Sequence, residues 1–258
     1  MTPQPVIFLG AGPGDPELIT LKGQKALAAA DVILYAGSLV SPAMLSWAKP
    51  TAELVDTAPL ALADIVARLI AAHRAGKKVV RLHSGDTSLY SAMQEQLQAL
   101  HAAGIPYEVI PGVTAAAAAA AALGRELTLP EVTQTVILTR APGRTPVPER
   151  QHLSRLAQHH ATLVIYLSIN LIEEVVAALR PEYGPRTPVV VAYRVSWPDQ
   201  RFLHGTLEDI ADKVRQAGIT RQALVMVGPA LASQEELQAR SRLYHEDFSH
   251  GYRRGQTD

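Results

Sequence analysis

Short runs of β-branched and other apolar residues alternate in this chain with stretches long enough to form helices. Such alternation is typical of an α/β protein, because each strand is then followed by a helix that covers the sheet. The first half predicts strands at residues 6–9, 32–35, 53–56, 77–82 and 107–110, with helices near 18–30, 60–75 and 88–103. The second half predicts strands at residues 134–140, 162–167, 189–195, 201–206 and 222–227.

Two turn signals indicate how the chain is organised. Pro111-Gly112 predicts a turn, and Thr114 is a candidate N-cap for the alanine-rich run that follows, so we place a domain boundary there. The turn-like stretch Trp197 to Gln200 favours an antiparallel hairpin within a mixed sheet. We expect an N-terminal α/β domain at 1–113, a C-terminal α/β domain at 114–236 and a peripheral, partly disordered tail at 237–258.

Composition excludes several kinds of partner and site. The 24 basic and 24 acidic side chains give a formal net charge of zero, so neither nucleic acid nor a membrane surface is expected as a partner. The chain has no cysteine, which excludes disulfides and thiolate metal sites within it. The adjacent pair His159-His160 lacks the spacing of metal ligands, so no metal is predicted. With no secretion leader and no apolar run of membrane-spanning length, the expected location is the cytoplasm.

A glycine-rich loop, Gly10 to Pro16, directly follows the first predicted strand. The carboxyl edge of the sheet, where this loop lies, is where open α/β folds bind ligands. The loop is not a dinucleotide fingerprint, because its third glycine comes one position early and no carboxylate follows the strand at 32–35. This argues against a nicotinamide-dependent oxidoreductase. A Walker loop is excluded too, since no Gly-Lys-Ser/Thr follows and Pro13 lacks an N–H for a phosphate.

Several ordered motifs together resemble the tetrapyrrole methylase family. They are residues 10–16 with Leu18, Thr20 and Gly23, then Ser84-Gly85-Asp86 before Tyr90, then Pro111 to Thr114. Further segments resemble the branch of that family that methylates precorrin-4 at carbon 11, namely residues 35–40, 133–140 and 143–149. The resemblance covers nearly all of residues 6–231. One position departs from it, because Thr87 stands where many relatives have proline.

The resemblance implies two α/β domains that bind S-adenosylmethionine in the cleft between them, with S-adenosylhomocysteine as product, and a homodimer. In the first domain and the linker it places these residues at the cofactor: Pro13, Ser84, Gly85, Asp86, Tyr90, Thr114 and Ala115. In the second domain it places these at the adenosine: Leu167, Ala192, Tyr193, Gly228, Pro229 and Ala230. The implied substrate is a polyanionic tetrapyrrole, a corrin precursor that carries many carboxylates.

Asp86 is the candidate catalytic residue, because a carboxylate on a glycine loop after a buried strand attracts the cofactor's cationic groups. Its alternative role is to cap a helix that begins at Ser88. The substrate's carboxylates require cationic donors, and guanidinium groups suit them best. The candidates are Arg81 and His83 on the first domain's central strand, and Arg140, Arg144, Arg150 and Arg194 in the second half. Each of these is equally compatible with a solvated surface charge.

Three interpretations of the function stay open on the sequence. The first is methylation of precorrin-4 at carbon 11, a step of corrin ring (cobalamin) biosynthesis. The second changes only the position methylated, with uroporphyrinogen III or another precorrin as substrate. The third is a noncatalytic tetrapyrrole- or nucleotide-binding protein on the same scaffold, which predicts cofactor binding without turnover.

Overall fold

The computed structural model describes residues 4–233, 246–249 and 251–254. The chain divides into two compact units, Met1–Ala119 with Arg194–Gln200, and Ala120–Tyr193 with Arg201–Asp258. The division falls within helix α4 (Ala115–Leu123), a few residues after the expected boundary at 113/114. The tail expected at 237–258 lies mostly outside the described residues. Across the described part of the chain, no helix is long and apolar enough to cross a membrane.

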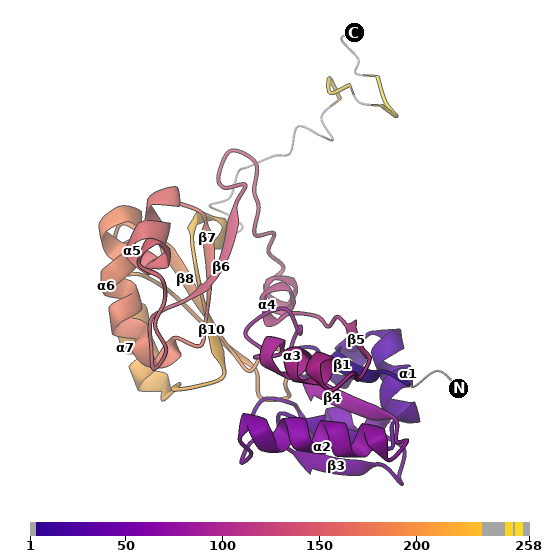
Figure 1. Ribbon diagram of the computed structural model, residues 1–258. Helices are drawn as coiled ribbons and strands as arrows, with labels where there is room; N and C mark the ends of the chain where they lie inside the picture. The colour runs from indigo at the N-terminus through magenta and orange to yellow at the C-terminus, as the bar shows by residue number, and fades with distance from the viewer. Residues whose placement is uncertain (1–3, 234–245, 250, 255–258) are drawn as a thin grey trace. The chain divides into compact units, whose positions relative to one another are not determined.

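The first unit contains a five-stranded parallel sheet (Figure 1). Its central strands are rich in Val, Ile and Leu and are buried on both faces, as a parallel sheet covered by helices requires. The strand order is β3-β2-β4-β1-β5. The strands are β1 (Val6–Gly10), β2 (Val32–Tyr35), β3 (Glu53–Asp56), β4 (Val79–His83) and β5 (Tyr107–Ile110).

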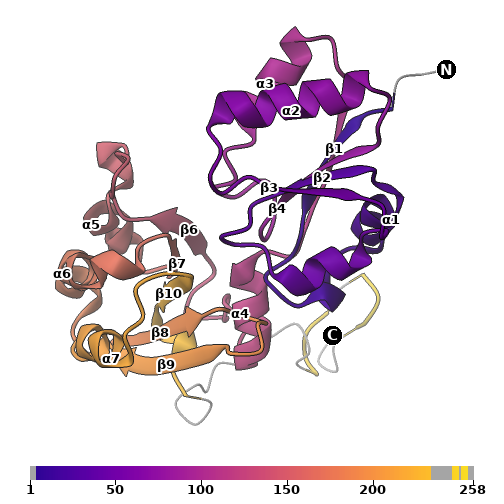
Figure 2. The same cartoon turned by 90° about the horizontal axis from the view of Figure 1, so that it is seen from below.

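Helices cover both faces of this sheet (Figure 2). One apolar cluster packs α1 (Leu21–Ala29) and the 3-10 helix η2 (Pro42–Trp47) on one face. A second cluster packs α2 (Leu62–Arg74) and α3 (Gln94–Ala102) on the other. The short 3-10 helix η1 (Pro16–Leu18) precedes α1. The sheet is therefore doubly wound, with connections on both of its faces.

The second unit contains a mixed sheet of five strands, with the order β6-β7-β10-β8-β9. β6 and β7 are parallel, whereas β10 runs antiparallel to both of its neighbours and β9 is antiparallel to β8. This confirms the hairpin predicted around residues 197–200. The strands are β6 (Val136–Arg140), β7 (Thr162–Tyr166), β8 (Pro188–Tyr193), β9 (Arg201–Thr206) and β10 (Ala223–Val227).

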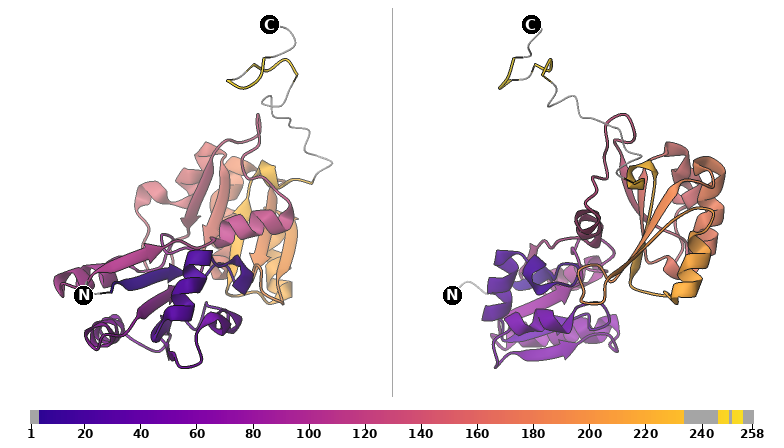
Figure 3. Two further views of the ribbon diagram at one scale, coloured as in Figure 1. Left: turned by 90° about the vertical axis from the view of Figure 1, so that its right-hand side faces the viewer. Right: turned by 180° about the vertical axis from the view of Figure 1, so that it is seen from behind.

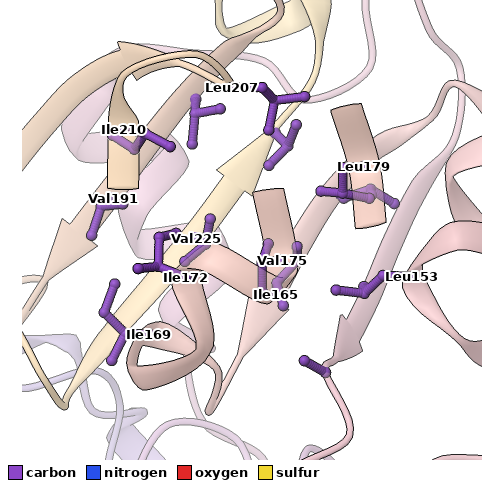
Figure 4. Packing of buried hydrophobic residues seen from close by; sticks show 14 of the residues in the cluster. Leu153, Ile165, Ile169, Ile172, Val175, Leu179, Val191, Leu207, Ile210 and Val225 are labelled. Atoms are coloured by element: carbon purple, nitrogen blue, oxygen red, sulfur yellow. The ribbon is translucent and has the colours of Figure 1, made fainter. Parts of the chain in front are cut away.

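Helices on one face of this sheet bury a large apolar cluster, in which Ile165 and Val225 of the strands lie among side chains such as Val175 and Leu179 of a helix (Figures 3 and 4). The helices are α5 (Leu153–Leu156), α6 (Ile172–Tyr183) and α7 (Ile210–Ala217). Short 3-10 helices connect the elements: η3 (Glu149–Gln151), η4 (Ala157–His159), η5 (Ile169–Leu171) and η6 (Pro229–Leu231). Two α/β sheets with separate cores confirm the predicted fold class.

Candidate active site

The chain leaves β1 and β4 on opposite faces of the first sheet, although these strands are neighbours. It passes from β1 to α1, and from β4 to α3 on the other face. Such a topological switch point, at the carboxyl ends of the strands, is where open α/β sheets bind ligands. The glycine loop at residues 10–16 and the loop at residues 84–93 both begin here. Two motifs that are far apart in the sequence therefore meet at one edge of the sheet.

Three glycines bring the loops after β1, β4 and β5 into backbone contact. A Cβ atom on Gly10 would lie 2.6 Å from the Gly85 carbonyl oxygen and 2.7 Å from the Gly112 nitrogen. A Cβ atom on Gly112 would lie only 2.2 Å from the same Gly85 oxygen. Gly12 and Gly85 also exchange two backbone hydrogen bonds, of 3.1 and 2.8 Å. Only glycine fits at positions 10 and 112, because neighbouring backbone occupies the space of a side chain there, whereas the space beside Gly85 is open.

The Asp86 carboxylate joins two of these loops. Its Oδ2 accepts the Gly112 N–H at 2.8 Å, and its Oδ1 accepts the Ser88 N–H at 2.9 Å and the Ser88 hydroxyl. Burial alone would raise the pKa of Asp86, but the hydrogen bonds from Ser88 and Gly112 hold it below its usual value. Helix α3 begins at Gln94, so the alternative that Asp86 caps a helix from Ser88 is wrong. The site thus contains a fixed, ionised carboxylate.

The loop after Asp86 carries backbone strain. Tyr90 and Ala92 have φ values of 53° and 49°, in the left-handed region that residues other than glycine rarely adopt. Such residues cost of order 1–3 kcal/mol each and concentrate at ligand sites, where the surrounding structure enforces them. Tyr90 is 44% exposed, so a large aromatic surface is held at this edge of the sheet. Thr87, the departure from the family pattern, is buried.

Arg81 is linked to this strained loop through the side chain of Gln96. Its Nε donates to Gln96 Oε1 at 3.0 Å, and Gln96 Nε2 donates to the Ala92 carbonyl at 3.1 Å. Its Nη1 donates to the carbonyl oxygens of Leu34 and Leu82, each at 3.3 Å. Only 5% of Arg81 is exposed, and burial lowers its pKa to about 10. The predicted role of Arg81 at substrate carboxylates is therefore not supported, because its donors are directed into the unit.

His83 lies on the same buried face of β4. Its ring stacks on Phe8 with 5.9 Å between the centroids, and its Nε2 has no hydrogen-bond partner among the described residues. Burial, and secondarily the nearby charge of Arg81, lowers the pKa of His83 to about 3. A neutral, buried imidazole does not supply the positive charge that its predicted substrate role requires.

In the second unit, the sheet register separates the residues expected at the adenosine. Leu167 follows β7, and Tyr193 is the last residue of β8. Both strands run antiparallel to β10 and so point the same way, which places the two residues at the same edge of the sheet. β10 runs the opposite way, so Gly228 lies beside Thr162, and its N–H donates to the Pro188 carbonyl. Because β7 is five residues long, Gly228 and Leu167 lie about 17 Å apart along the strand direction. The structure therefore does not bring Gly228, Pro229 and Ala230 together with Leu167, Ala192 and Tyr193.

Leu167 is nevertheless distinctive within its own edge of the sheet. It has a φ of 55° and is 62% exposed, which is unusual for a leucine. Ala192 is buried on β8, which β10 separates from β7. Tyr193 is half-buried, and the guanidinium of Arg201 lies 4.8 Å from the centre of its ring. In the linker, Thr114 and Ala115 lie at the start of α4, where the Thr114 carbonyl accepts the Ala118 N–H at 3.1 Å.

The arginines of the second half fall into two groups. Arg140 donates to the carbonyls of its own loop, including Pro146 at 2.7 Å, so its guanidinium stabilises that loop. Arg194 pairs with Asp199 at 2.5 Å within the hairpin tip. Arg144 and Arg150 are exposed. These last two have the accessibility that a carboxylate-binding role requires.

Sequence reasoning missed Trp197 and Gln96 as residues of this site. The sequence predicts Trp197 only as part of a turn, yet its indole N–H donates to the Pro13 carbonyl in the glycine loop at 3.0 Å. A tryptophan among polar turn residues is a signal of a buried contact, although the sequence does not name its partner. The described residues contain no group of three His, Cys, Asp or Glu side chains that could hold a metal ion.

A switch-point site of this kind defines an α/β ligand-binding protein, and comparison with known proteins gives its family. Residues 5–211 match the family of tetrapyrrole (corrin/porphyrin) methylases, and the chain belongs to it. The chain is 52% identical over 251 residues to a precorrin-4 C(11)-methyltransferase of Pseudomonas aeruginosa, covering 97% of this chain and 99% of that protein.

Two solved structures resemble the chain closely. One is a cobalamin biosynthetic enzyme, a cobalt precorrin-4 methyltransferase, with a TM-score of 0.86 and 46% identity over 88% of this chain and 96% of that one. The other is a uroporphyrin-III C-methyltransferase of Thermus thermophilus in complex with S-adenosyl homocysteine. Its TM-score is 0.74 and its identity is 30%, over 90% of this chain and 96% of that one.

Proposed function

We propose that this protein transfers a methyl group from S-adenosylmethionine to carbon 11 of precorrin-4, a step of corrin ring biosynthesis. The observation that carries the proposal is the similarity over almost the whole chain to a methyltransferase of that name, at 52% identity. The lower identity to a uroporphyrin-III methyltransferase favours carbon 11 of precorrin-4 over the alternative substrate.

The first unit offers a site that suits S-adenosylmethionine. Gly85 has open space where a side chain would lie, so a ligand can approach its backbone closely, and the ionised Asp86 carboxylate belongs to the next residue. A carboxylate suits the ammonium and sulfonium charges of this molecule. The proposed contacts are Pro13, Ser84, Gly85, Asp86, Tyr90, Thr114 and Ala115 in the first unit, with Leu167, Ala192 and Tyr193 in the second. The Thermus thermophilus relative, bound to S-adenosyl homocysteine, supports this choice.

When bound, S-adenosylmethionine supplies an electrophilic methyl group with a good leaving group, so orientation is the protein's main contribution to the rate. The close backbone packing at Gly10 and Gly112 and the left-handed residues of the Tyr90 loop restrict how these loops can move, which suits an orienting role. Asp86 fixes two loops and balances cationic charge at the site. No covalent intermediate with the protein is required.

The substrate is proposed to be a polyanionic tetrapyrrole, recognised in part by Arg144 and Arg150. Both are exposed, and a guanidinium binds a carboxylate through two parallel hydrogen bonds. A homodimer and a cytoplasmic location belong to the same proposal. Relatives named for precorrin-4 and for cobalt precorrin-4 have 52% and 46% identity, so the metal state of the substrate is a question for the assay.

The test is to mix the purified protein with methyl-labelled S-adenosylmethionine and, separately, precorrin-4, cobalt-precorrin-4 and uroporphyrinogen III. Product mass and carbon NMR then give the number and position of the methyl groups added. Asp86→Asn tests the site, and Asp64→Asn, at an exposed acid on α2, is the matched control. One new methyl at carbon 11 supports the proposal. Transfer only to uroporphyrinogen III would replace the substrate, and cofactor binding without any transfer would favour the noncatalytic alternative.

A further inference from the structure

The tip of the β8–β9 hairpin, Arg194–Gln200, belongs to the first unit, whereas the two strands belong to the second sheet. Within the first unit the tip contacts the glycine loop. The Trp197 indole N–H donates to the Pro13 carbonyl at 3.0 Å, and the Asp15 N–H donates to the Ser196 hydroxyl oxygen at 2.9 Å. The tip therefore satisfies a backbone acceptor and a backbone donor only two residues apart.

Gly14 lies between these two hydrogen bonds and is covered by the same indole. A Cβ atom at position 14 would lie 2.2 Å from Trp197 Cδ1 and 2.4 Å from Trp197 Nε1. Gly14 does not have a positive φ, so its backbone conformation is open to other residues. Glycine is required at position 14 because the indole occupies the space of a side chain.

Other residues of the hairpin tip contact the indole and its backbone. The Arg194 guanidinium lies 4.0 Å from the centre of the ring and pairs with Asp199 at 2.5 Å. The backbone N–H of Trp197 donates to the Arg194 carbonyl at 3.0 Å, and Gln200 Oε1 accepts the backbone N–H of Ser196 at 2.9 Å. Arg194 and Ser196 both have positive φ values, 45° and 64°. Strain of this kind persists only where the surrounding contacts enforce one conformation.

Both tryptophans of the chain donate to the glycine loop. Trp47, at the end of η2, donates its indole N–H to the Pro16 carbonyl at 3.1 Å, while Trp197 serves Pro13. Both prolines of the loop at the switch point thus accept an indole hydrogen bond, and Trp197 also fills the space over Gly14.

We propose that Trp197 is a positioning residue for the S-adenosylmethionine site. Its indole holds residues 13–15 of the glycine loop in the shape that receives the methyl donor, and Arg194 orients the indole rather than the substrate. This inference rests on the proposed function. The hairpin tip would lower the free-energy cost of binding, because a glycine loop that is already ordered does not have to be ordered when the ligand binds.

The test is a double-mutant cycle between Gly14→Ala and Trp197→Ala, with the Kd for S-adenosyl homocysteine measured by calorimetry. In the wild-type background we expect Gly14→Ala to raise the Kd at least about tenfold, because the new methyl displaces the indole or the loop. In the Trp197→Ala background the same change has room, and its effect is expected to fall below about twofold. Trp197→Phe, which keeps a ring and loses the N–H, is expected to raise the Kd about five- to tenfold.

Trp47→Phe is the matched control, because it removes the other indole hydrogen bond to the loop. In that background Gly14→Ala should keep its full effect on the Kd. Circular dichroism and the Tm check that each variant is folded, and kcat and KM for S-adenosylmethionine are measured in parallel. A positioning role predicts that KM rises in Trp197→Phe.

Two results would overturn the inference. One is an equal effect of Gly14→Ala with and without Trp197, and the other is a lower Tm for Trp197→Phe with its Kd within twofold of wild type. If the wild-type protein itself binds neither S-adenosylmethionine nor S-adenosyl homocysteine, the proposed function fails and this inference with it. Binding by the wild type with an unchanged Kd in Trp197→Phe refutes the role of the hairpin tip alone.

Discussion

His83 makes the stability of the first unit depend on pH in a way that the structure specifies. Its pKa is lowered from the ordinary 6.5 to about 3, first by burial and then by the charge of Arg81. Below pH 6.5 the unfolded chain binds a proton at this position and the folded chain does not, so stability is full above pH 6.5 and falls as the pH drops toward 3. The slope approaches about 1.4 kcal/mol per pH unit well below pH 6.5, and the integrated loss between pH 6.5 and 4.5 amounts to ~2.3 kcal/mol.

The variant His83→Phe removes this proton-binding group. Phenylalanine keeps a ring against Phe8 and leaves no Nε2 to satisfy, so we expect the free energy of unfolding at pH 7 to change by less than about 1 kcal/mol. The variant should also lose ~2.3 kcal/mol less than the wild type between pH 6.5 and 4.5. Both tryptophans lie in the first unit, so urea unfolding followed by tryptophan fluorescence reports on that unit.

The control is His101→Gln, at an exposed position of α3, which should follow the wild-type pH profile. The pH range is kept above 4.5 because Asp86, whose pKa is lowered from 3.8, adds its own loss of stability at lower pH. Identical pH profiles for the wild type and His83→Phe would refute the assignment of a neutral, buried imidazole at this position.

Three further predictions concern the site. Gly112→Ala places a Cβ atom 2.2 Å from a backbone oxygen, so we expect the free energy of unfolding to fall by about 1–3 kcal/mol and S-adenosyl homocysteine binding to become unmeasurable. Gly143→Ala, where the nearest atom to the new Cβ is 3.8 Å away, is the neutral control. Gln96→Leu removes the shortest hydrogen bond of a buried guanidinium and should cost about 2–3 kcal/mol by urea unfolding. Adding Arg81→Met should recover part of this loss, because the buried charge is then removed together with its acceptor; a double variant less stable than Gln96→Leu would contradict this. Asp86→Asn keeps the shape but loses the charge and one acceptor, so calorimetry should show a Kd for S-adenosylmethionine about tenfold higher, and an unchanged Kd would remove Asp86 from the site.

Local sequence patterns predicted the strands of this protein well. Residues 32–35, 53–56, 107–110 and 201–206 form strands with the expected bounds, because β-branched runs and flanking turn residues act over short distances. Helix α3 was expected from residue 88 and begins at Gln94. Asp86 instead accepts both the local Ser88 N–H and the Gly112 N–H, 26 residues away, and no local pattern encodes the second pairing.

The sequence by itself determined the α/β class and the ligand-binding motifs, because glycine spacing and apolar periodicity are properties of neighbouring residues. Tertiary structure alone decided which side chains reach the site. Arg81 and His83 lie on one face of a strand whose two faces are both covered, so the guanidinium and the imidazole are buried. The reversed direction of β10 moves Gly228 away from Leu167, and Trp197 reaches Pro13 across 184 positions of sequence. These outcomes depend on strand order and long-range packing, which become fixed only when the whole chain folds.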